Sequence, residues 1–244
     1  MSEWTNERAI ERWGTMPRKL LEDMAHDGDY AKRHLVNPVL LRLLGDVAGR
    51  RILDAGCGGG YLSRMLAARG AEVVGVEPGR SLFEFAAERE ATAPQGIRYV
   101  RADLCDLPDL CDLPDLCDRF DAVVSSMVLP VIPDWTGAMR ACVEHLRPGG
   151  LFVFTVNHPC FEQLAPTWRA HGEYRTRRYL AEYEIPGPSG ANFHRPLSAY
   201  LNQLAALGCR LTEVAEPGLP PETPDAVEAY IHLPNFLIVA ATTA

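Results

Sequence analysis

A glycine-rich turn between a strand-like and a helix-like segment constrains the fold of this 244-residue chain more than any other feature. The segment RILDA (51–55) is short and apolar, GCGGG follows it, and YLSRMLAARG (61–70) has the apolar spacing of a helix. Glycines there let a ligand approach the backbone at the carboxyl end of the strand, where the next helix offers free N–H groups. The turn therefore predicts a ligand site at the start of an α/β unit.

The alternation of strand-like and helix-like segments continues along the chain. Apolar runs at 71–77, 97–103, 120–126 and 151–156 predict strands separated by helices. A helix at 196–208, followed by strands at 209–217 and 234–243, predicts an antiparallel hairpin at the sheet edge. The pattern indicates an α/β fold with a doubly wound, mostly parallel sheet and helices on both faces.

We predict one domain over residues 1–244, with two additions to the α/β core. Segment 3–26 has the pattern of one amphipathic helix, and a polar connector separates it from a second helix at 38–48. Residues 1–34 are expected to form an N-terminal helical cover. The alternation stops at 157–195, which is rich in aromatic residues, proline and arginine. We expect this segment to be an inserted lid that faces the substrate.

Charge and hydropathy limit the partners of the chain. The net charge of −8 and a pI of about 5.4 disfavour nucleic acid and anionic membranes as main partners. The N-terminal segment is charged where a signal peptide would be apolar, and no stretch approaches the roughly 20 apolar residues of a membrane span. We therefore expect a cytoplasmic protein that binds a small molecule as a monomer or homodimer.

Residues 103–118 repeat the six-residue unit DLCDLP. The repeat is too short for a solenoid, and we interpret it as an expansion in a surface loop. A metal site built from Cys105, Cys111 and Cys117 is the alternative, but five residues separate these cysteines, unlike the closer spacing of zinc knuckles. The seven cysteines form no recognisable disulfide framework, and we expect no metal.

Carboxylates stand at the ends of the first three predicted strands. Asp54 suits the cationic ammonium of a methionine moiety and would repel a pyrophosphate. A dinucleotide turn would also need glycine where Tyr61 stands. Glu77 is placed to accept hydrogen bonds from ribose hydroxyls, and Asp103 from an adenine amino group, with Leu104 against the ring. Asp54 and Tyr61 favour S-adenosylmethionine (SAM) over a nicotinamide dinucleotide, whereas Glu77 would suit the ribose of either.

Several segments, in order, resemble the successive motifs of class I SAM-dependent methyltransferases: ILDAGCGGGYLSRML, VVGVEPGRSL, RADLCDLP, FDAVVSSMVL and LRPGGLFVFTVNHP. The resemblance is strong over residues 35–160. HPCF, HRPLSAYLNQLAALG and LPNFLIV resemble a bacterial small-molecule branch of that family. The family implies a seven-stranded sheet in the order 3-2-1-4-5-7-6 with an antiparallel last strand. It also implies that SAM lies across the carboxyl ends of the first strands and that S-adenosylhomocysteine (SAH) is the product.

The resemblance also implies a set of cofactor-binding residues, including a basic residue, Lys32 or Arg33, that meets the SAM carboxylate. Pro130 stands where related proteins often have a histidine, so a base at that point is missing. The implied cofactor site is Lys32, Asp54, Gly56, Cys57, Gly58, Glu77, Pro78, Asp103, Leu104, Ser125 and Met127.

Methyl transfer is an in-line displacement that depends mainly on holding the reacting groups collinear, and a base is needed only if the acceptor must lose a proton. His158 and His194 are the candidate bases, although each could instead be a structural histidine. Arginines of the insertion could bind a carboxylate or phosphate, or could simply keep the lid soluble. The predicted substrate-binding residues are His158, Phe161, Tyr174, Phe193, His194 and Tyr200.

We therefore expect SAM-dependent methyl transfer to an oxygen, nitrogen, sulfur or carbon nucleophile of a small metabolite. A nicotinamide-dependent oxidoreductase is one alternative, which Asp54 and Tyr61 disfavour. A SAM-binding protein of this fold with a non-methylating role is another, because the cofactor motifs would be the same. Nucleic-acid methylation is disfavoured because SSMV (125–128) stands where such enzymes carry an Asn/Asp-Pro-Pro-aromatic tetrapeptide.

Overall fold

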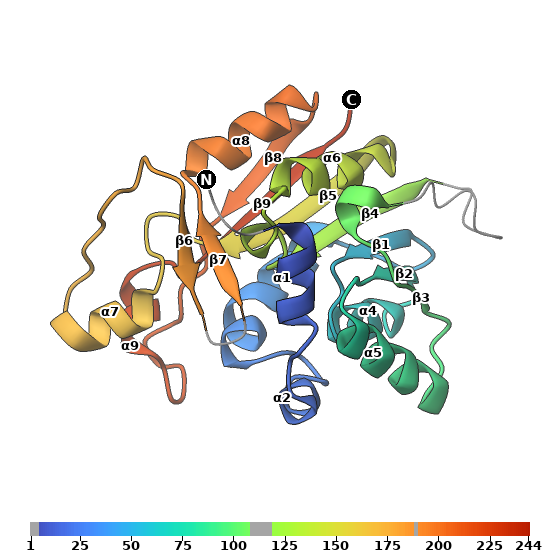
Figure 1. The fold of residues 1–244 in the computed structure, drawn as a ribbon, viewed down its shortest axis with the longest axis horizontal. Helices are drawn as coiled ribbons and strands as arrows, with labels where there is room; N and C mark the ends of the chain where they lie inside the picture. Colours follow the sequence, from blue (N-terminus) through green and yellow to red (C-terminus); the bar gives the residue numbers. More distant parts are fainter. Residues whose placement is uncertain (1–4, 108–118, 188–189) are drawn as a thin grey trace.

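A seven-stranded sheet forms the centre of the molecule (Figure 1). The computed structural model describes residues 5–107, 119–187 and 190–244. The later part of the six-residue repeat, with Cys111 and Cys117, lies outside them. The strands of the sheet are β1 (Arg51–Ala55), β2 (Glu72–Val76), β3 (Arg98–Val100), β4 (Phe120–Ser126), β5 (Leu146–Asn157), β8 (Arg210–Ala215) and β9 (Phe236–Thr242).

The strand order is β3-β2-β1-β4-β5-β9-β8, and a separate two-stranded hairpin comprises β6 (Tyr183–Pro186) and β7 (Ala191–His194). When this hairpin is left out of the count, the order is the expected 3-2-1-4-5-7-6. β9 runs antiparallel to both of its neighbours, β5 and β8, whereas β1 to β5 pair in parallel. The predicted doubly wound α/β fold is therefore confirmed.

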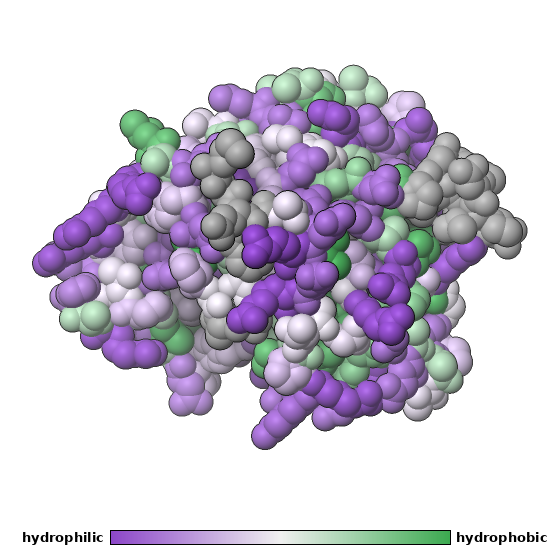
Figure 2. Space-filling view, in the orientation of Figure 1, coloured by the Kyte–Doolittle hydropathy of each residue, from purple (hydrophilic) through white to green (hydrophobic). Residues whose placement is uncertain are grey.

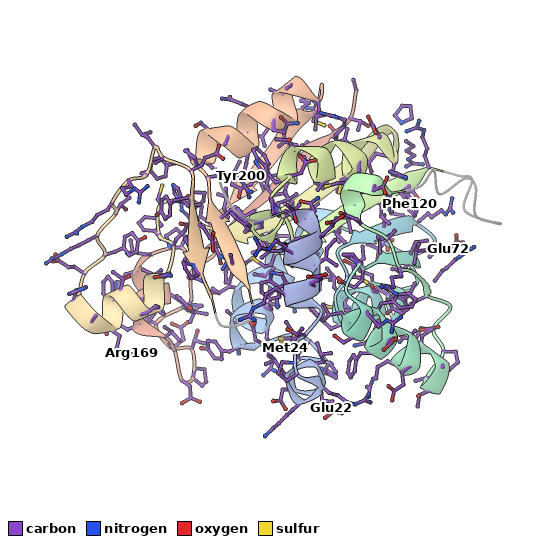
Figure 3. All side chains as sticks on the ribbon, in the orientation of Figure 1. Glu22, Met24, Glu72, Phe120, Arg169 and Tyr200 are labelled. Atoms are coloured by element: carbon purple, nitrogen blue, oxygen red, sulfur yellow. The ribbon has the colours of Figure 1, made fainter. Side chains whose placement is uncertain are left out.

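Helices cover both faces of the sheet (Figure 1). They are α3 (Asn37–Leu44), α4 (Tyr61–Ala67), α5 (Arg80–Thr92), α6 (Trp135–Glu144), α8 (Leu197–Ala206) and the short α9 (Glu228–His232). Successive strand residues face opposite sides of the sheet, so Leu53 and Val123 pack with α6 and α8, and Ile52 with α3 and α4. Tyr200 of α8, labelled in Figure 3, is one of the largest fully buried side chains.

The N-terminal segment forms two helices where we expected one. α1 (Asn6–Trp13) ends at Gly14, whose N–H donates to the Ile10 carbonyl, and α2 (Arg18–Asp23) starts after Pro17. Pro17 has no N–H to continue the ladder of α1, so the helix cannot run through it. Part of the expected connector is a π-helix, Lys32–Val36, that leads into α3.

The inserted segment leaves the sheet after β5 and adds one helix, α7 (Leu164–His171), before the β6–β7 hairpin. α7 packs against α9 through Trp168 and His232, whose rings stack with centroids 5.5 Å apart. Hydrophilic side chains predominate on the left of the view in Figure 2, where the insertion lies, although Leu180 is exposed there. None of the helices in the described ranges is long and apolar enough to span a bilayer.

Candidate functional site

The glycine turn after β1 has the backbone conformation that its sequence predicts. Gly56 and Gly58 have φ angles of +80° and +55°, which side-chain-bearing residues rarely adopt. A Cβ on Gly56 would lie 2.4 Å from a methyl carbon of Val128, so this glycine lets the segment after β4 pack closely. A Cβ on Gly58 would have no heavy atom within 4 Å, so the backbone there is open to a ligand.

Asp54, at the end of β1, is almost completely buried. Its Oδ2 atom accepts a hydrogen bond of 2.6 Å from the hydroxyl of Ser63 on α4. Burial raises the pKa of this carboxyl group to about 6, although the bond from Ser63 acts in the opposite direction. A cation placed beside Asp54 would favour its ionised form.

Glu77 follows β2, and both of its carboxylate oxygens accept backbone N–H groups. One bond comes from Gly58 at 3.0 Å and the other from Gly79 at 2.7 Å, so the side chain bridges two turns of the site. Burial raises its pKa to about 7. The free lone pairs of such a carboxylate can accept further hydrogen bonds from a vicinal diol.

Asp103 follows β3 and caps a short 3₁₀ helix, η2 (Leu104–Asp106). One of its oxygens accepts the backbone N–H of Cys105 at 3.0 Å. The other accepts the side-chain amide of Asn6 at 3.4 Å, which ties the N-terminal helix α1 to the third strand end. Asn6 also accepts the backbone N–H of Asp134 at 3.0 Å.

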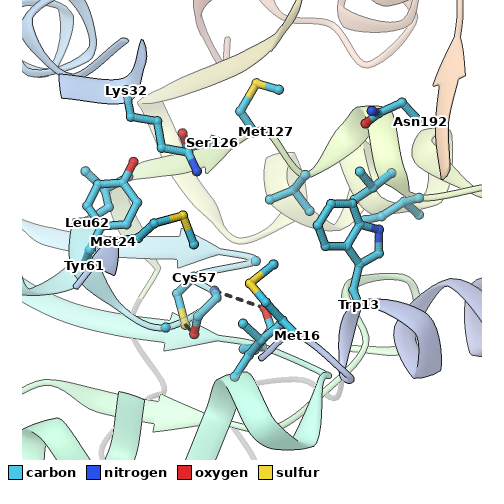
Figure 4. A pocket seen from close by; sticks show the side chains of 18 of the residues that line it. Trp13, Met16, Met24, Lys32, Cys57, Tyr61, Leu62, Ser126, Met127 and Asn192 are labelled. Atoms are coloured by element: carbon cyan, nitrogen blue, oxygen red, sulfur yellow. Dashed lines mark hydrogen bonds between the residues drawn. The ribbon is translucent and has the colours of Figure 1, made fainter. Parts of the chain in front are cut away.

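These three carboxylates line one cavity of about 690 Å³, within the range of about 300–1,000 Å³ that small-molecule sites occupy. Figure 4 shows Lys32 and Tyr61 on one side of it and Trp13 and Asn192 on the other. The N-terminal helices α1 and α2 supply further lining residues, among them Asn6, Ile10 and Leu21. Members of the predicted cofactor set in the lining are Lys32, Asp54, Gly56, Cys57, Gly58, Glu77, Pro78, Asp103, Leu104 and Met127.

Ser125 is the one predicted cofactor residue that does not line the cavity. It is fully buried within β4, whereas its neighbour Ser126 faces the cavity. Successive side chains of a strand point to opposite faces of the sheet. Ser125 and Ser126 therefore point in opposite directions, and only Ser126 lines the cavity. Arg33, the alternative to Lys32, is likewise outside the lining and pairs with Asp27 at 2.9 Å.

The turn after β4 places Met127 at the cavity in a strained conformation. Its φ angle is 63°, in the left-handed region that residues with a side chain seldom occupy. Two hydrogen bonds from its backbone N–H to Thr155 hold it there, one to the carbonyl at 3.0 Å and one to the hydroxyl at 3.1 Å. Strain of this kind concentrates at functional sites.

His158, a predicted base, is buried outside this cavity with both ring nitrogens engaged. Nδ1 accepts the backbone N–H of Cys160 at 3.1 Å, so Nε2 must carry the proton that is shared with Glu216 at 2.6 Å. Burial also lowers the pKa of His158. The geometry therefore favours the structural role for this histidine over the catalytic one.

His194, the last residue of β7, also has both ring nitrogens engaged by protein atoms. Its Nδ1 lies 2.8 Å from a carboxylate oxygen of Glu162, and its Nε2 lies 2.8 Å from the carbonyl oxygen of Tyr179. The ring also stacks on Tyr183, with centroids 4.6 Å apart. His194 is thus a structural contact of the insertion and does not line the cavity.

The remaining predicted substrate residues are also absent from the cavity lining. Phe161 and Tyr174 contact each other within the insertion, with ring centroids 5.4 Å apart. Tyr200 packs against Trp135 in the core beneath α8, and Phe193 of β7 is buried. Phe193 and Tyr200 are thus buried in the protein interior, and Phe161 and Tyr174 are half-buried against each other.

The cavity is also lined by asparagines that sequence reasoning missed. Asn157 ends β5, Asn192 lies in β7, and Asn235 immediately precedes β9. Asn157 and Asn235 stand at strand ends, and position at a strand end is also what pointed to the three carboxylates. Nothing local marks Asn192, because its position depends on how the hairpin folds over the sheet.

The fold and the cavity are those of the Rossmann-like proteins that bind an adenosine-containing ligand at the carboxyl ends of parallel strands. Comparison with known proteins defines the family. A family model described as "Methyltransferase domain" matches residues 53–154. A ubiquinone biosynthesis O-methyltransferase of Alkalilimnicola ehrlichii is 36% identical over 132 residues, 52% of this chain and 51% of the relative. The chain thus spans about half the length of the curated relatives it matches.

Solved structures give the wider match. A SAM-dependent methyltransferase from Mesorhizobium loti is 31% identical, with a TM-score of 0.69, and the alignment covers 84% of this chain and 96% of that one. A structure described as a putative SAM-dependent methyltransferase from Listeria monocytogenes is 25% identical, with a TM-score of 0.64, covering 83% and 95%. The chain therefore belongs to the family of SAM-dependent methyltransferases.

Proposed function

We propose that this protein transfers the methyl group of SAM to a nucleophilic atom of a small molecule. The observation that carries the proposal is the convergence of Asp54, Glu77 and Asp103 on one cavity beside the open backbone of Gly58. When bound, SAM supplies a methyl group on a positively charged sulfur. The acidic lining favours this cation over the uncharged sulfur of SAH, and so favours the donor over the product.

The cofactor end would be bound by groups that the strand ends supply. Asp54 would accept hydrogen bonds from the ammonium of the methionine moiety, and Lys32 would bind its carboxylate. Glu77 would accept the ribose hydroxyls, and Asp103 the adenine amino group, with Leu104 and Pro78 beside the ring. These roles fit the donor and acceptor capacity of each side chain.

Catalysis would depend on positioning. Among the described lining residues there is no histidine, and the acidic side chains are those proposed to hold the donor, apart from Asp29, whose carboxylate lies 3.5 Å from the ammonium of Lys32. The chain would then act by excluding water and aligning the acceptor with the methyl group. An acceptor that is already nucleophilic fits this site better than one that needs a base.

We extend the proposal to the two additions to the core. Residues 1–34 would act as a cover, because Asn6, Ile10 and Trp13 of α1 line the cavity. Residues 157–195 would act as a substrate-facing lid, since Asn157 and Asn192 line the same cavity. The whole chain would function as a single domain, in the cytoplasm, as a monomer or homodimer.

Calorimetric titration with SAM tests the cofactor site. Glu77→Gln removes the charge that would accept the ribose hydroxyls, and we expect binding to weaken by at least about tenfold, since hydrogen bonds to charged groups contribute about 1.5–3 kcal/mol. Glu72→Gln, an exposed carboxylate at the start of β2, is the matched control and should bind as the parent does. Equal affinity in Glu77→Gln and the parent would contradict the assignment.

Transfer of a labelled methyl group from SAM to candidate acceptors tests the reaction. A parent protein that binds SAM tightly and methylates none of a broad panel of small molecules would favour the non-methylating alternative. Tight binding of a nicotinamide dinucleotide, with none of SAM, would favour the oxidoreductase.

A further inference from the structure

Three asparagines from separate segments line the cavity, in the part that we assign to the acceptor. Asn157 and Asn235 are neighbours across the β5–β9 pair, because Asn157 is in register with Phe236 and the His158 N–H donates to the Asn235 carbonyl at 3.0 Å. Asn192 reaches the same cavity from β7 of the insertion. Figure 4 shows Asn192 near Trp13, across the cavity from Lys32.

Within the described ranges, none of these three carboxamides makes a side-chain hydrogen bond to another residue. Each carboxamide has two N–H donors and an oxygen acceptor, and a half-buried group of this kind gains when a ligand satisfies it. Other asparagines behave differently: Asn37 donates to the Asp27 carbonyl at 2.7 Å, and Asn6 bonds Asp103 and Asp134. The acceptor end thus offers hydrogen bonds that the protein itself does not use.

The charges around the cavity select against an anionic acceptor. Lys32 is the single cation among the described lining residues, and its Nζ atom lies 3.5 Å from Asp29. No arginine of the insertion is among the described lining residues: Arg195 donates to backbone carbonyls, and Arg175 pairs with Glu173 at the surface. A carboxylate or phosphate would enter a cavity lined by carboxylates without a free cation to balance it.

The walls of this end are apolar. Val131 and Ile132 line the cavity after β4, Phe236 lies beside Asn235, and Tyr230 comes from α9. Such walls bury the body of a ligand, while a few polar groups fix its orientation.

We propose that Asn157, Asn192 and Asn235 determine acceptor specificity: the site takes an uncharged molecule with an apolar ring or chain and neutral hydrogen-bonding groups, such as hydroxyl, carbonyl or carboxamide. This inference rests on the proposed function, because it assigns the acceptor half of the same cavity. It identifies the chemistry that the site recognises, and it explains why the lid contributes an amide to the cavity and no arginine.

The test uses matched probes on the full chain saturated with SAH. The probes are benzamide, 2-naphthamide and indole-2-carboxamide, each compared with the carboxylate of the same ring. We expect at least one carboxamide to bind, and at least about tenfold more tightly than its carboxylate. Asn157→Leu and Asn235→Leu should each weaken that binding about fivefold, the equivalent of one hydrogen bond of about 1 kcal/mol. Asn202→Leu, at an exposed position on α8, should not.

Titration of the same variants with SAH separates the two proposals. Unchanged SAH affinity in Asn157→Leu and Asn235→Leu shows that the fold and the cofactor site are intact. The acceptor proposal is overturned if the carboxylates bind as well as the carboxamides, if no carboxamide binds, or if both leucine variants bind the carboxamides as the parent does. Failure of the parent to bind SAM or SAH would instead overturn the proposed function.

Discussion

Individual carboxylates and histidines in this protein divide into those that a ligand can reach and those that the chain uses for itself. Asp54 and Glu77 are buried, which raises the pKa of each carboxyl group, but both line the cavity. A ligand in the cavity can therefore interact with these two carboxyl groups directly. His158 and His194 are equally buried, yet their ring nitrogens are all engaged by protein atoms. A histidine is therefore informative about catalysis only after its partners are known.

His158→Gln should separate a structural from a catalytic histidine. We expect a lower melting temperature, because Glu216 and the Cys160 N–H lose their partner, and a kcat reduced less than tenfold. Removal of a general base would instead cost about 10²–10⁴ in rate. The measurement is thermal denaturation together with methyl transfer across a pH range. His26→Gln, whose side chain is 96% exposed, is the control. A loss of three orders of magnitude in kcat with the melting temperature unchanged would restore the catalytic role.

At the scale of elements, the insertion is joined to the core by Arg195, which follows β7. Its guanidinium is buried and donates to the carbonyls of Leu129 and Ile132 at 2.9 and 2.8 Å. It also lies 5.3 Å from the ring centroid of Trp135 on α6. Because Ile132 lines the cavity, this one side chain connects the insertion to a segment of the cavity wall.

Arg195→Met should loosen that connection. The buried carbonyls of Leu129 and Ile132 would lose charged donors, so we expect the free energy of unfolding to fall by about 3 kcal/mol. The KM for the acceptor should rise more than the Kd for SAM, because the affected segment lines the acceptor end. Urea denaturation and steady-state kinetics measure these effects. Arg177→Met, at an exposed position of the insertion, is the control, and equal stability of the two variants would refute the coupling.

The strand ends that carry the three carboxylates could be predicted from the sequence, whereas the hairpin that carries Asn192 could not. Asp54 and Glu77 stand at the ends of buried apolar strands, and Asp103 follows the short, half-buried β3. Parallel strands bring their carboxyl ends to one edge whatever surrounds them. Asn192 reaches the cavity from a hairpin of two four-residue strands, which are too short for their pattern to stand out within the insertion. The break between α1 and α2 was visible as Pro17 but was outweighed by the helical spacing around it.

At the scale of the whole molecule, the buried acids link folding, pH and ligand binding. Burial raises the pKa of Asp54 from 3.8 to about 6 and that of Glu77 from 4.5 to about 7. The folded protein without ligand therefore binds more protons than the unfolded chain between about pH 4 and pH 7. The stability that these two groups contribute is complete below about pH 4 and is lost as the pH rises through 6 and 7.

Binding of SAM should show the opposite pH dependence. SAM brings positive charge into the cavity that Asp54 and Glu77 line, and this charge favours the ionised forms of both carboxyl groups. At any pH at which the free protein holds protons on these groups, binding of SAM therefore releases protons. We expect the Kd for SAM to fall at least about tenfold between pH 5 and pH 7, since a shift of one pKa unit corresponds to about 1.4 kcal/mol. This window lies below the range of about 7.7–8.0 in which an α-amino group such as that of the donor titrates.

Calorimetry in buffers of different ionisation enthalpy measures the proton release directly, and thermal denaturation with and without SAM measures the linkage to folding. The ligand-induced rise in melting temperature should grow from pH 5 to pH 7 even as the ligand-free protein loses the contribution of its two buried acids. Glu77→Gln should remove the part of the pH dependence near 7 and leave the part near 6, which belongs to Asp54. Proton uptake on binding SAM, or a Kd that does not change over this range, would show that these carboxylates do not face the donor's charge.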